Sequence, residues 1–222
     1  MAGALARLSG FDFPIQLSDT TKAYFTRTAK LVGGEAGAAM VNLVADPSDK
    51  TANEIVSRDP VWHSMLRTTC VATLIEGGHA ANALPQHVSA NVNCRIFPGM
   101  SVATVKSTLE GVIADPKVSI TAVGDLAPTP PAPPLSDAVL GPAEKVAHDM
   151  WPGVPVLPTM STGATDGSYL NAFGIPTYGL SGMFSDASMG NIHGLNERMG
   201  VQALMEGREY LYRVIKLYSN GK

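Results

Sequence analysis

RTTCVATLIEGGHAANALPQHVSANVNCRIFPG, residues 67–99, contains two runs rich in β-branched residues, and each run ends in a turn that contains glycine. Such runs predict two β-strands. The segment between them, GGHAANALPQH, is longer than a tight hairpin loop and contains a proline, so we expect a structured, exposed connection with a specific role. With a register centred near Asn82, Cys70 and Cys94 lie roughly opposite each other. This predicts packing if the thiols are reduced and a bridge only if they are oxidised.

Two further elements follow the predicted strands. Apolar residues recur at helical spacing from 102 to 113, and Ser101 stands at the N-cap position, which predicts a helix. Residues 118–123, VSITAV, predict a third strand. The order strand, strand, helix, strand matches the later part of a ferredoxin-like β-α-β-β-α-β unit, whose first strand would lie before Met1.

The residues before the first strand have helical spacing. Residues 4–8 are typical of the end of an amphipathic helix. Residues 20–31 and 36–44 predict a helical hairpin that starts at the capping residues Ser18 and Asp19.

A proline-rich segment divides the chain. Residues 127–135, APTPPAPPL, favour an extended polyproline conformation and cannot join a helix or a central strand, so we expect a domain boundary there. Beyond it, a helix from 136 to 149 and short apolar strands at 154–160 and 176–180 predict the edge of an α/β sheet. A long amphipathic helix is expected to pack on that sheet. Its apolar stripe consists of Leu204, Leu211, Val214, Ile215 and Tyr218.

Composition excludes several classes of protein. The 222 residues include 16 Lys and Arg and 19 Asp and Glu, and no run of basic residues occurs. The chain thus has no excess of positive charge to neutralise phosphates, which argues against a nucleic-acid partner. No apolar run approaches the roughly 20 residues that span a bilayer, and the first residues lack a secretion signal, so we expect a soluble chain, with a cytoplasmic location favoured. Cys70 and Cys94 have no CxxC spacing and are interpreted as buried thiols that pack as small hydrophobes.

Three segments combine glycine with small polar residues, which lets a backbone approach a ligand closely. They are GGHAANALP (77–85), STGATDGSYL (161–170) and GNIHGLNER (190–198). In this order and spacing they resemble the di-zinc metallopeptidase and amidohydrolase clan. That clan includes carboxypeptidase S, glutamate carboxypeptidase, aminoacylase and succinyl-diaminopimelate desuccinylase, and the match to carboxypeptidase S is the nearest.

The resemblance implies a zinc-dependent hydrolase. Members bind two zinc ions, and a glutamate acts as general base while a bridging water attacks an amide carbonyl. His193 matches the C-terminal metal ligand of the clan, although a histidine that caps the last helix is the ordinary alternative. Asp166 is also considered as a ligand, and a structural role in its loop is favoured. His79 does not match the clan's oxyanion histidine and is interpreted as a loop histidine, with contact to substrate left open.

The same resemblance assigns substrate-binding residues. Asn82 matches the asparagine of a turn that reaches across a dimer toward the substrate, and its alternative role is to stabilise its own turn. Arg95 matches an arginine that could clamp a substrate carboxylate, and a structural salt bridge is the alternative. Gly163, Ala164 and Thr165 resemble the loop that holds the free carboxylate of the substrate. His63, His87 and His148 show no partner spacing and are given ordinary roles.

The expected architecture is α/β. Residues 1–126 are predicted to form an incomplete ferredoxin-like lid domain with a helical insertion, which dimerises, and residues 127–222 the C-terminal half of the catalytic domain. The His-x-Asp and Glu-Glu motifs of the clan are absent from this sequence. The chain is therefore expected to contribute at most one zinc ligand and to be inactive alone as part of an exopeptidase or N-acyl-amino-acid amidohydrolase. The alternative is a non-catalytic dimerisation or small-molecule-binding module derived from this fold.

Overall fold

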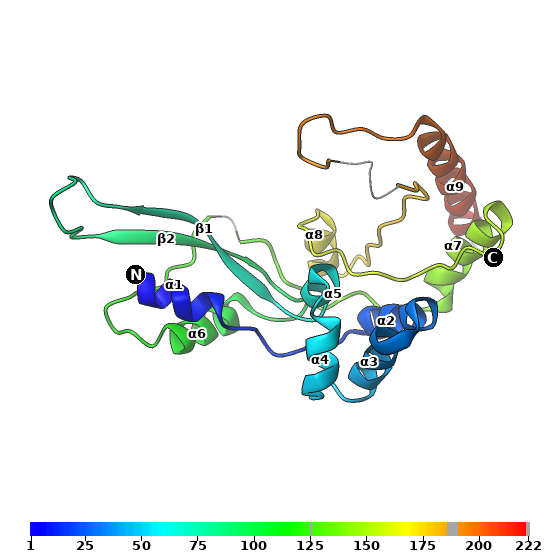
Figure 1. Cartoon of the computed structure of the whole chain (residues 1–222). Coiled ribbons are helices and arrows are strands. Elements are labelled where there is room, and N and C mark those ends of the chain that lie inside the picture. Colours follow the sequence, from blue (N-terminus) through cyan, green and yellow to red (C-terminus); the bar gives the residue numbers. More distant parts are fainter. Residues whose placement is uncertain (125, 186–190, 221–222) are drawn as a thin grey trace. The chain divides into compact units, whose positions relative to one another are not determined.

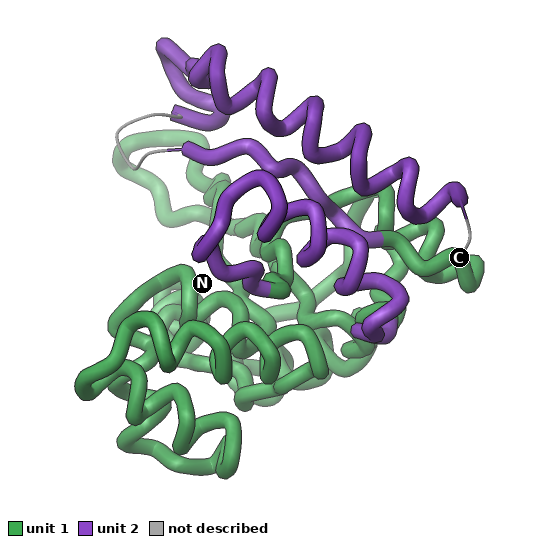
Figure 2. Tube along the Cα trace, turned by 90° about the vertical axis from the view of Figure 1, so that its right-hand side faces the viewer, with its two compact units in different colours: residues 1–133, 158–177 green, residues 134–157, 178–222 purple. Residues whose placement is uncertain are grey.

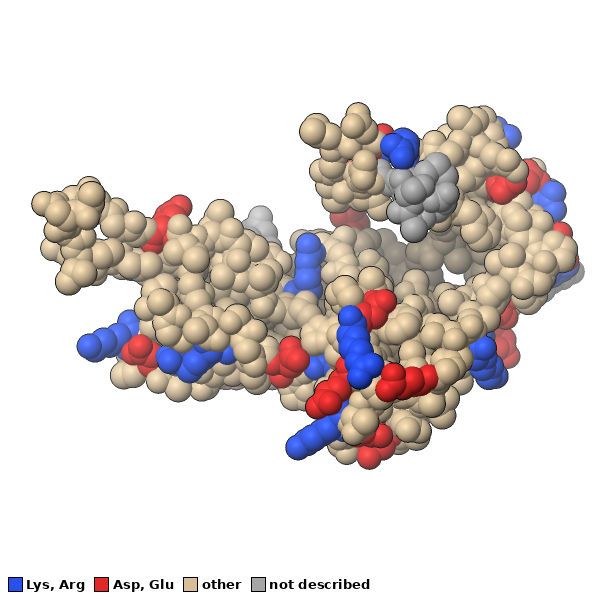
Figure 3. All heavy atoms as spheres, viewed as in Figure 1, with Lys and Arg blue, Asp and Glu red and all other residues tan. Residues whose placement is uncertain are grey.

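The computed structural model describes residues 1–124, 126–185 and 191–220. The chain divides into two compact units, Met1–Pro133 with Pro158–Thr177, and Pro134–Leu157 with Tyr178–Lys222 (Figure 2). Within the described ranges no helix is both long enough and apolar enough to cross a membrane. Basic and acidic side chains are interspersed on the face shown in Figure 3.

The first unit contains an antiparallel hairpin, whose far end projects away from the helices (Figure 1). Strands β1 (Thr69–Gly77) and β2 (Val88–Arg95) confirm the two strands predicted from the sequence. Cys70 lies opposite Cys94, and the ladder shifts register between Ala72 and Leu74, where a β-bulge interrupts it. The cysteines are joined in a disulfide, so the interpretation as two separate thiols is wrong. Their opposed positions in the register are the physical reason.

Two helices pack on one face of this hairpin. They are α1 (Ala2–Ser9) and α6 (Val102–Ile113), and α6 begins as predicted, with the Ser101 hydroxyl accepting a hydrogen bond from the amide of Thr104 at 3.0 Å. Because the apolar residues of both helices recur at helical spacing, each presents one stripe to the strands. The resulting core contains Leu8, Phe13, Val105 and Leu109, against which Cys70, Val92, Cys94 and Ile120 pack.

The predicted third strand is not formed. Residues 118–123 make no ladder with any described residue, and the described sheet has two strands. Ile120 nevertheless packs on the core of α1 and α6. The apolar contact is therefore present, while no described strand offers hydrogen bonds to the backbone of this segment.

A helical insertion of four helices separates α1 from β1. The predicted hairpin is confirmed as α2 (Asp19–Val32) and α3 (Gly34–Ala45). Ser18 and Thr21 form a reciprocal capping box at the start of α2. Gly37 lets the two helices approach closely, since a Cβ atom there would lie 2.6 Å from the carbonyl oxygen of Ala29.

Two short helices of the insertion were not predicted. They are α4 (Lys50–Val56) and α5 (Pro60–Met65), capped by the carboxylates of Asp49 and Asp59, which accept backbone hydrogen bonds. Neither is long enough to show a helical period, so only the Asp caps and Pro60 signalled them. Their buried residues join α2 and α3 in one core of Phe25, Ala29, Ala39, Met40, Leu43, Ala52, Val56, Met65 and Leu66.

Arg67 links the insertion to the hairpin. Its side chain is buried, with the residue 3% exposed, and its guanidinium donates to the carboxamide of Asn53 and, at 3.2 Å, to the hydroxyl of Ser57 on the α4 side. Asp12 supplies a carboxylate 3.6 Å from the same guanidinium. The carboxylate of Asp12 also lies 3.4 Å from Nε2 of His63, so His63 has a charged partner that sequence spacing did not reveal.

Acid should weaken this junction through His63. Burial, together with the neighbouring charge of Arg67, lowers the pKa of His63 below its ordinary value, and Asp12 only partly opposes this. Because the unfolded chain then binds the proton at a higher pH, stability is fully present above about pH 6.5 and falls as the pH drops toward the depressed pKa. Urea unfolding at about pH 7.5 and about pH 5.5 should show a larger loss in the wild type than in His63→Gln, which does not titrate. Equal losses would contradict the expectation.

The second unit is built from two helices, α7 (Asp137–Met150) and α9 (Val201–Ser219), both of which were predicted. Tyr210 and Val214 pack against Val146 and Ala147. The Tyr210 hydroxyl donates to the carbonyl of Ala143 at 3.2 Å, and burial raises the pKa of this phenol. A loop containing Gly182, whose φ is +60°, approaches the ring of Tyr210 so closely that a Cβ atom would not fit.

The strands predicted around α7 are not formed. Residues 154–160 and 176–180 have no ladder partners in the part of the chain that the structure describes. The last helix consequently packs on α7 instead of a sheet. Of its predicted stripe only Val214 is buried, whereas Ile215 is 61% exposed. An apolar run becomes a strand only when neighbouring strands satisfy its backbone groups.

Candidate functional site

The first candidate segment is the connection between β1 and β2. Residues 78–87 are all exposed, and Leu84 is 90% exposed. Asn82 lies in a turn in which the amide of Ala83 donates to the carbonyl of Ala80 at 3.3 Å. No described group hydrogen-bonds to the Asn82 side chain, so its carboxamide is available to a ligand or partner.

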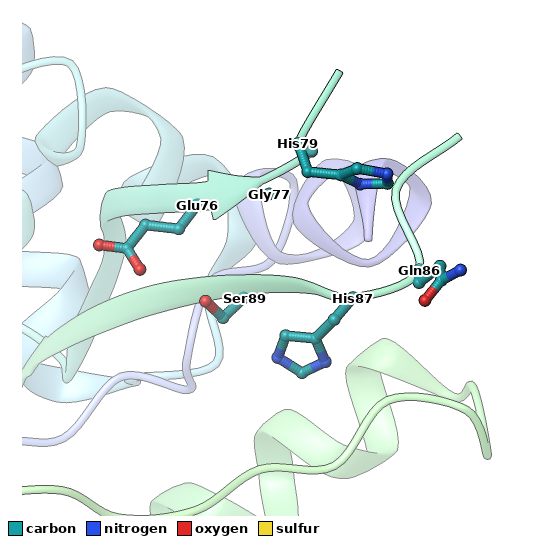
Figure 4. A pocket seen from close by; sticks show the side chains of 7 residues that line it. Glu76, Gly77, His79, Gln86, His87 and Ser89 are labelled. Atoms are coloured by element: carbon teal, nitrogen blue, oxygen red, sulfur yellow. The ribbon is translucent and has the colours of Figure 1, made fainter. Parts of the chain in front are cut away.

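A shallow hollow of about 320 Å³ lies where the ladder ends (Figure 4). His79 enters it from the β1 side, and Gln86 and His87 enter from the β2 side. Glu76, Gly77, Gly78 and Ser89 complete the lining. Sequence reasoning gave His79 and His87 ordinary roles, and the structure brings both to one hollow, although Asn82 does not line it.

Arg95 lies at the opposite end of the hairpin from Asn82. It ends β2, pairs with Thr69 in the register and is exposed. Since successive residues of a strand point to opposite faces, Arg95 points away from the face of its neighbour Cys94, which contacts the helices. No carboxylate of the described residues forms a salt bridge with Arg95, and both its roles, in substrate binding and in structure, stay predictions.

The loop before α8 (Gly167–Ala172) contains the three residues predicted to hold a carboxylate. The amide of Gly163 donates to the hydroxyl of Ser161 at 3.3 Å, while the carbonyl of Thr165 accepts from the hydroxyl of Ser168 at 3.0 Å. The hydroxyl of Thr165 accepts from the amide of Gly167 at 3.4 Å. Gly163, Ala164 and Thr165 are therefore held in an exposed turn whose shape is set by local bonds.

Asp166 and Gly167 follow this loop directly and differ in their contacts. Asp166 is the N-cap residue of α8, but its carboxylate makes no capping hydrogen bond. Gly167 is buried, and a Cβ atom there would lie 3.1 Å from the side chain of Thr177. The amide of Thr177 donates to the carboxamide of Asn171 at 2.8 Å, so side-chain contacts that do not include the Asp166 carboxylate hold the loop against its helix.

His193 lies in an exposed, tightly wound turn of the second unit. Asn191, His193 and Asn196 all have positive φ angles, of 47°, 64° and 61°. The amide of Gly194 donates to the carbonyl of Asn191 at 2.6 Å, and the carboxamide of Asn191 donates to the carbonyl of Leu195 at 3.2 Å. Positive φ is unfavourable for residues other than glycine and tends to cluster at functional sites. A helix-capping role for His193 has no support, because Gly200 is the N-cap of α9.

The chain alone does not assemble a metal site in its described residues. No three His, Cys, Asp or Glu side chains converge there. His193 has an imidazole that is exposed and free of hydrogen bonds to other described groups, which suits one ligand of a zinc ion whose remaining ligands come from elsewhere. Asn82, Arg95 and Gly163–Thr165 belong to the first unit and His193 to the second.

Comparison of the sequence with known families gives one match that covers more than half of the chain. The model described as a peptidase dimerisation domain, of the M20 peptidases, matches residues 1–121. This region includes the helical insertion and the hairpin, with Asn82 and Arg95. It ends before the loop that carries Gly163, Ala164 and Thr165.

Curated relatives extend the similarity beyond that region. An N-fatty-acyl-amino acid synthase/hydrolase from Xenopus tropicalis is 28% identical over 155 residues, which cover 68% of this chain and 30% of that protein. Its human counterpart is 26% identical over 168 residues, covering 74% and 33%. A probable carboxypeptidase S-like protein from Dictyostelium discoideum is 22% identical over 165 residues, covering 74% and 32%. The chain thus matches about a third of the length of these relatives.

A solved structure shares the fold. It is an M20 family metallo-carboxypeptidase from Sulfolobus solfataricus, with a TM-score of 0.58 and 16% sequence identity, and the match covers 98% of this chain and 51% of that one. At this sequence identity the match supports a shared fold alone. The expected fold class, a partial lid domain followed by part of a zinc-peptidase catalytic domain, is confirmed by this match and by the family match.

Proposed function

Because the chain belongs to the peptidase dimerisation domain family of the M20 peptidases, we propose that it is the C-terminal part of a zinc-dependent exopeptidase or N-acyl-amino-acid amidohydrolase. The enzyme would hydrolyse an amide bond next to a free carboxylate. The observation that carries the proposal is the turn at residues 191–196, where His193 and the flanking Asn191 and Asn196 all have positive φ, and where the exposed imidazole has no hydrogen-bond partner among the described residues.

The candidate residues of this chain would have different roles in the enzyme. His193 would hold zinc through its neutral imidazole, and bound zinc would polarise the amide carbonyl and lower the pKa of a bound water. Arg95 would pair with the substrate carboxylate, since a guanidinium can donate two parallel hydrogen bonds to it. The exposed amides of Ala164 and Thr165 could donate to the same carboxylate, and the Asn82 carboxamide could contact the polar groups of the substrate from a second copy.

The remaining machinery would come from outside the chain. The clan's other metal ligands and its catalytic glutamate have no counterpart in the sequence, so we expect the chain by itself to be inactive. We also expect a homodimer formed through the lid domain. The alternative of a non-catalytic dimerisation module is favoured by the exposed apolar side chains of β1, Val71, Leu74 and Ile75, which a second copy could cover.

The proposal predicts a carboxylate requirement that depends on Arg95. In the enzyme extended upstream to include the missing motifs, an N-acetylated amino acid should be hydrolysed, and the same compound with its carboxylate converted to an amide should react far more slowly. Arg95→Met should lower kcat/KM for the carboxylate substrate by about 10- to 100-fold, because one charge-assisted pair is lost. It should barely affect the amide substrate.

Arg58→Met is the matched control for this experiment. Arg58 is an exposed arginine of the same unit, 3.2 Å from Glu35, and should not affect kcat/KM for either substrate. A similar loss for both substrates in Arg95→Met would show that Arg95 acts on folding and not on recognition. An extended enzyme that hydrolyses neither substrate but still dimerises would favour the non-catalytic alternative.

A further inference from the structure

The disulfide between Cys70 and Cys94 joins the two strands of the hairpin where they face each other directly. The Cα atoms are 4.1 Å apart, and the residues are 24 positions apart in the sequence. This is close to the short Cα separation of a non-hydrogen-bonded antiparallel pair. Both residues are half-buried on the core of α1 and α6, and Val92, two residues nearer the loop, packs on the same core, so the bridge lies within the part of the hairpin that the helices support.

Beyond the bridge, Val92 packs on the core of α1 and α6, and the strands nearer the loop have little else to determine their register. Leu74 is 61% and Ile75 63% exposed, and the described sheet offers no third strand to either edge. An isolated two-stranded hairpin is marginally stable in water, and register is weakly specified where neither face is buried. The bulge between Ala72 and Leu74, near the bridge, already shifts the register of the ladder once. The polar link between Asn91 and Thr73, at 2.8 Å, is exposed and weak.

Register also determines where Arg95 points. Arg95 follows Cys94 directly and pairs with Thr69, the residue before Cys70. A slip of one residue would turn the whole strand over, so that Arg95 would face the helices and Cys94 the solvent. A covalent bond between Cys70 and Cys94 forbids this slip.

We propose that the Cys70–Cys94 pair is a redox-sensitive lock on the β1–β2 hairpin. In the bridged form the register is fixed. The part of the strands between the bridge and the loop that carries Asn82, here called the distal ladder, then keeps its hydrogen bonds. In the reduced form the distal ladder opens while the helical insertion stays folded, because the core of Phe25, Met40 and Leu43 does not include the hairpin. The consequence for substrate recognition by Arg95 and Asn82 rests on the proposed function, whereas the lock itself does not.

The chemistry is thiol–disulfide exchange. A thiolate of an external dithiol attacks one sulfur of the bridge, which releases the other cysteine as a thiolate; the second thiol of the reagent then displaces the first cysteine. The bridge gains two electrons and two protons, and the reagent is released as its own disulfide. Closure is the reverse, with a disulfide such as oxidised glutathione as the electron acceptor. Disulfides persist in oxidising compartments, so the bridged lid is the form expected there and the open lid the form expected in a reducing cytoplasm.

Hydrogen exchange on the chain tests the lock directly. Protein purified in air should show no free thiols until a dithiol is added, and should then show two. On reduction the amides of 71–77 and 88–93 should exchange about 30-fold faster, which corresponds to ~2 kcal/mol of lost local stability. Amides of α2 and α3 should keep their protection. The Cys70→Ala, Cys94→Ala double variant should exchange like the reduced wild type, and the dithiol should not change it further.

Three outcomes would overturn the proposal. Free thiols that persist after treatment with oxidised glutathione would show that the bridge does not form. If the hydrogen-exchange rates of the hairpin amides did not change after reduction, the bridge would not stabilise the hairpin. Simultaneous loss of protection in α2 and α3 would show that the bridge supports the whole unit and is no local lock. Because no substrate or zinc is used, failure here is distinct from failure of the proposed hydrolase function.

Discussion

Replacing His193 with alanine is expected to remove zinc and to lower kcat/KM of the upstream-extended enzyme by about a thousandfold, or ~4 kcal/mol of transition-state stabilisation. The imidazole is exposed and has no hydrogen-bond partner among the described residues, so its loss should cost the fold little. The measurements are zinc content by elemental analysis after dialysis and the rate of hydrolysis of an N-acetylated amino acid.

His148→Ala is the matched control for this variant. His148 is an exposed histidine in the last turn of α7, within the same unit as His193. Zinc content and activity should not change, and both variants should unfold at the urea concentration of the wild type. If His193→Ala binds as much zinc as His148→Ala, His193 is not a ligand, and the strained turn needs another explanation.

The second large effect is expected at Arg67. Arg67→Ala removes a buried guanidinium that donates to Asn53 and Ser57, after which the carboxamide oxygen of Asn53 keeps only the hydroxyl of Ser57 as a donor. Breaking a buried polar cluster in this way typically costs about 3–5 kcal/mol, part of which is the cavity left by the side chain. Arg67→Met, which loses the same hydrogen bonds but fills most of the space, should cost less, because it leaves a smaller cavity.

Urea unfolding followed by circular dichroism measures both Arg67 variants, and Arg58→Ala is the control. Arg58 forms an exposed salt bridge with Glu35, and such pairs contribute about 0–1 kcal/mol. If Arg67→Ala and Arg58→Ala were equally stable, Arg67 would not be the junction between insertion and hairpin. If Arg67→Met were as damaging as Arg67→Ala, the charge itself and not the packing would be required.

Local signals predicted the elements that satisfy their own backbone groups. The α2–α3 hairpin, α6, α7 and α9 each carry a helical period, and in α2 and α6 a serine cap also appears in the structure. A helix forms its hydrogen bonds within one segment, so sequence alone is sufficient. The β1–β2 hairpin was predictable for a similar reason, because both strands and their connection are contiguous.

Composition and resemblance identified the candidate residues. They did not predict which groups surround those residues in the structure. The segments that carry Asn82, Thr165 and His193 were recognised as loops, and the structure describes each of them as exposed. The positive φ angles around His193 leave no periodic signal in a sequence, since asparagine and histidine adopt many conformations in loops. Glycine and asparagine on either side were the only local hint.

The sequence by itself determined where the long helices and the hairpin lie, which loops contain candidate functional residues and which family the chain resembles. Only the tertiary structure decided that residues 118–123, 154–160 and 176–180 stay unpaired, that Cys70 and Cys94 are bridged, and that Arg67 is buried among Asn53, Ser57 and Asp12. The physical reason is common to all of these features. A strand, a disulfide and a buried arginine each need partners from other segments of the chain, and the pattern of one segment does not reveal whether those partners are present.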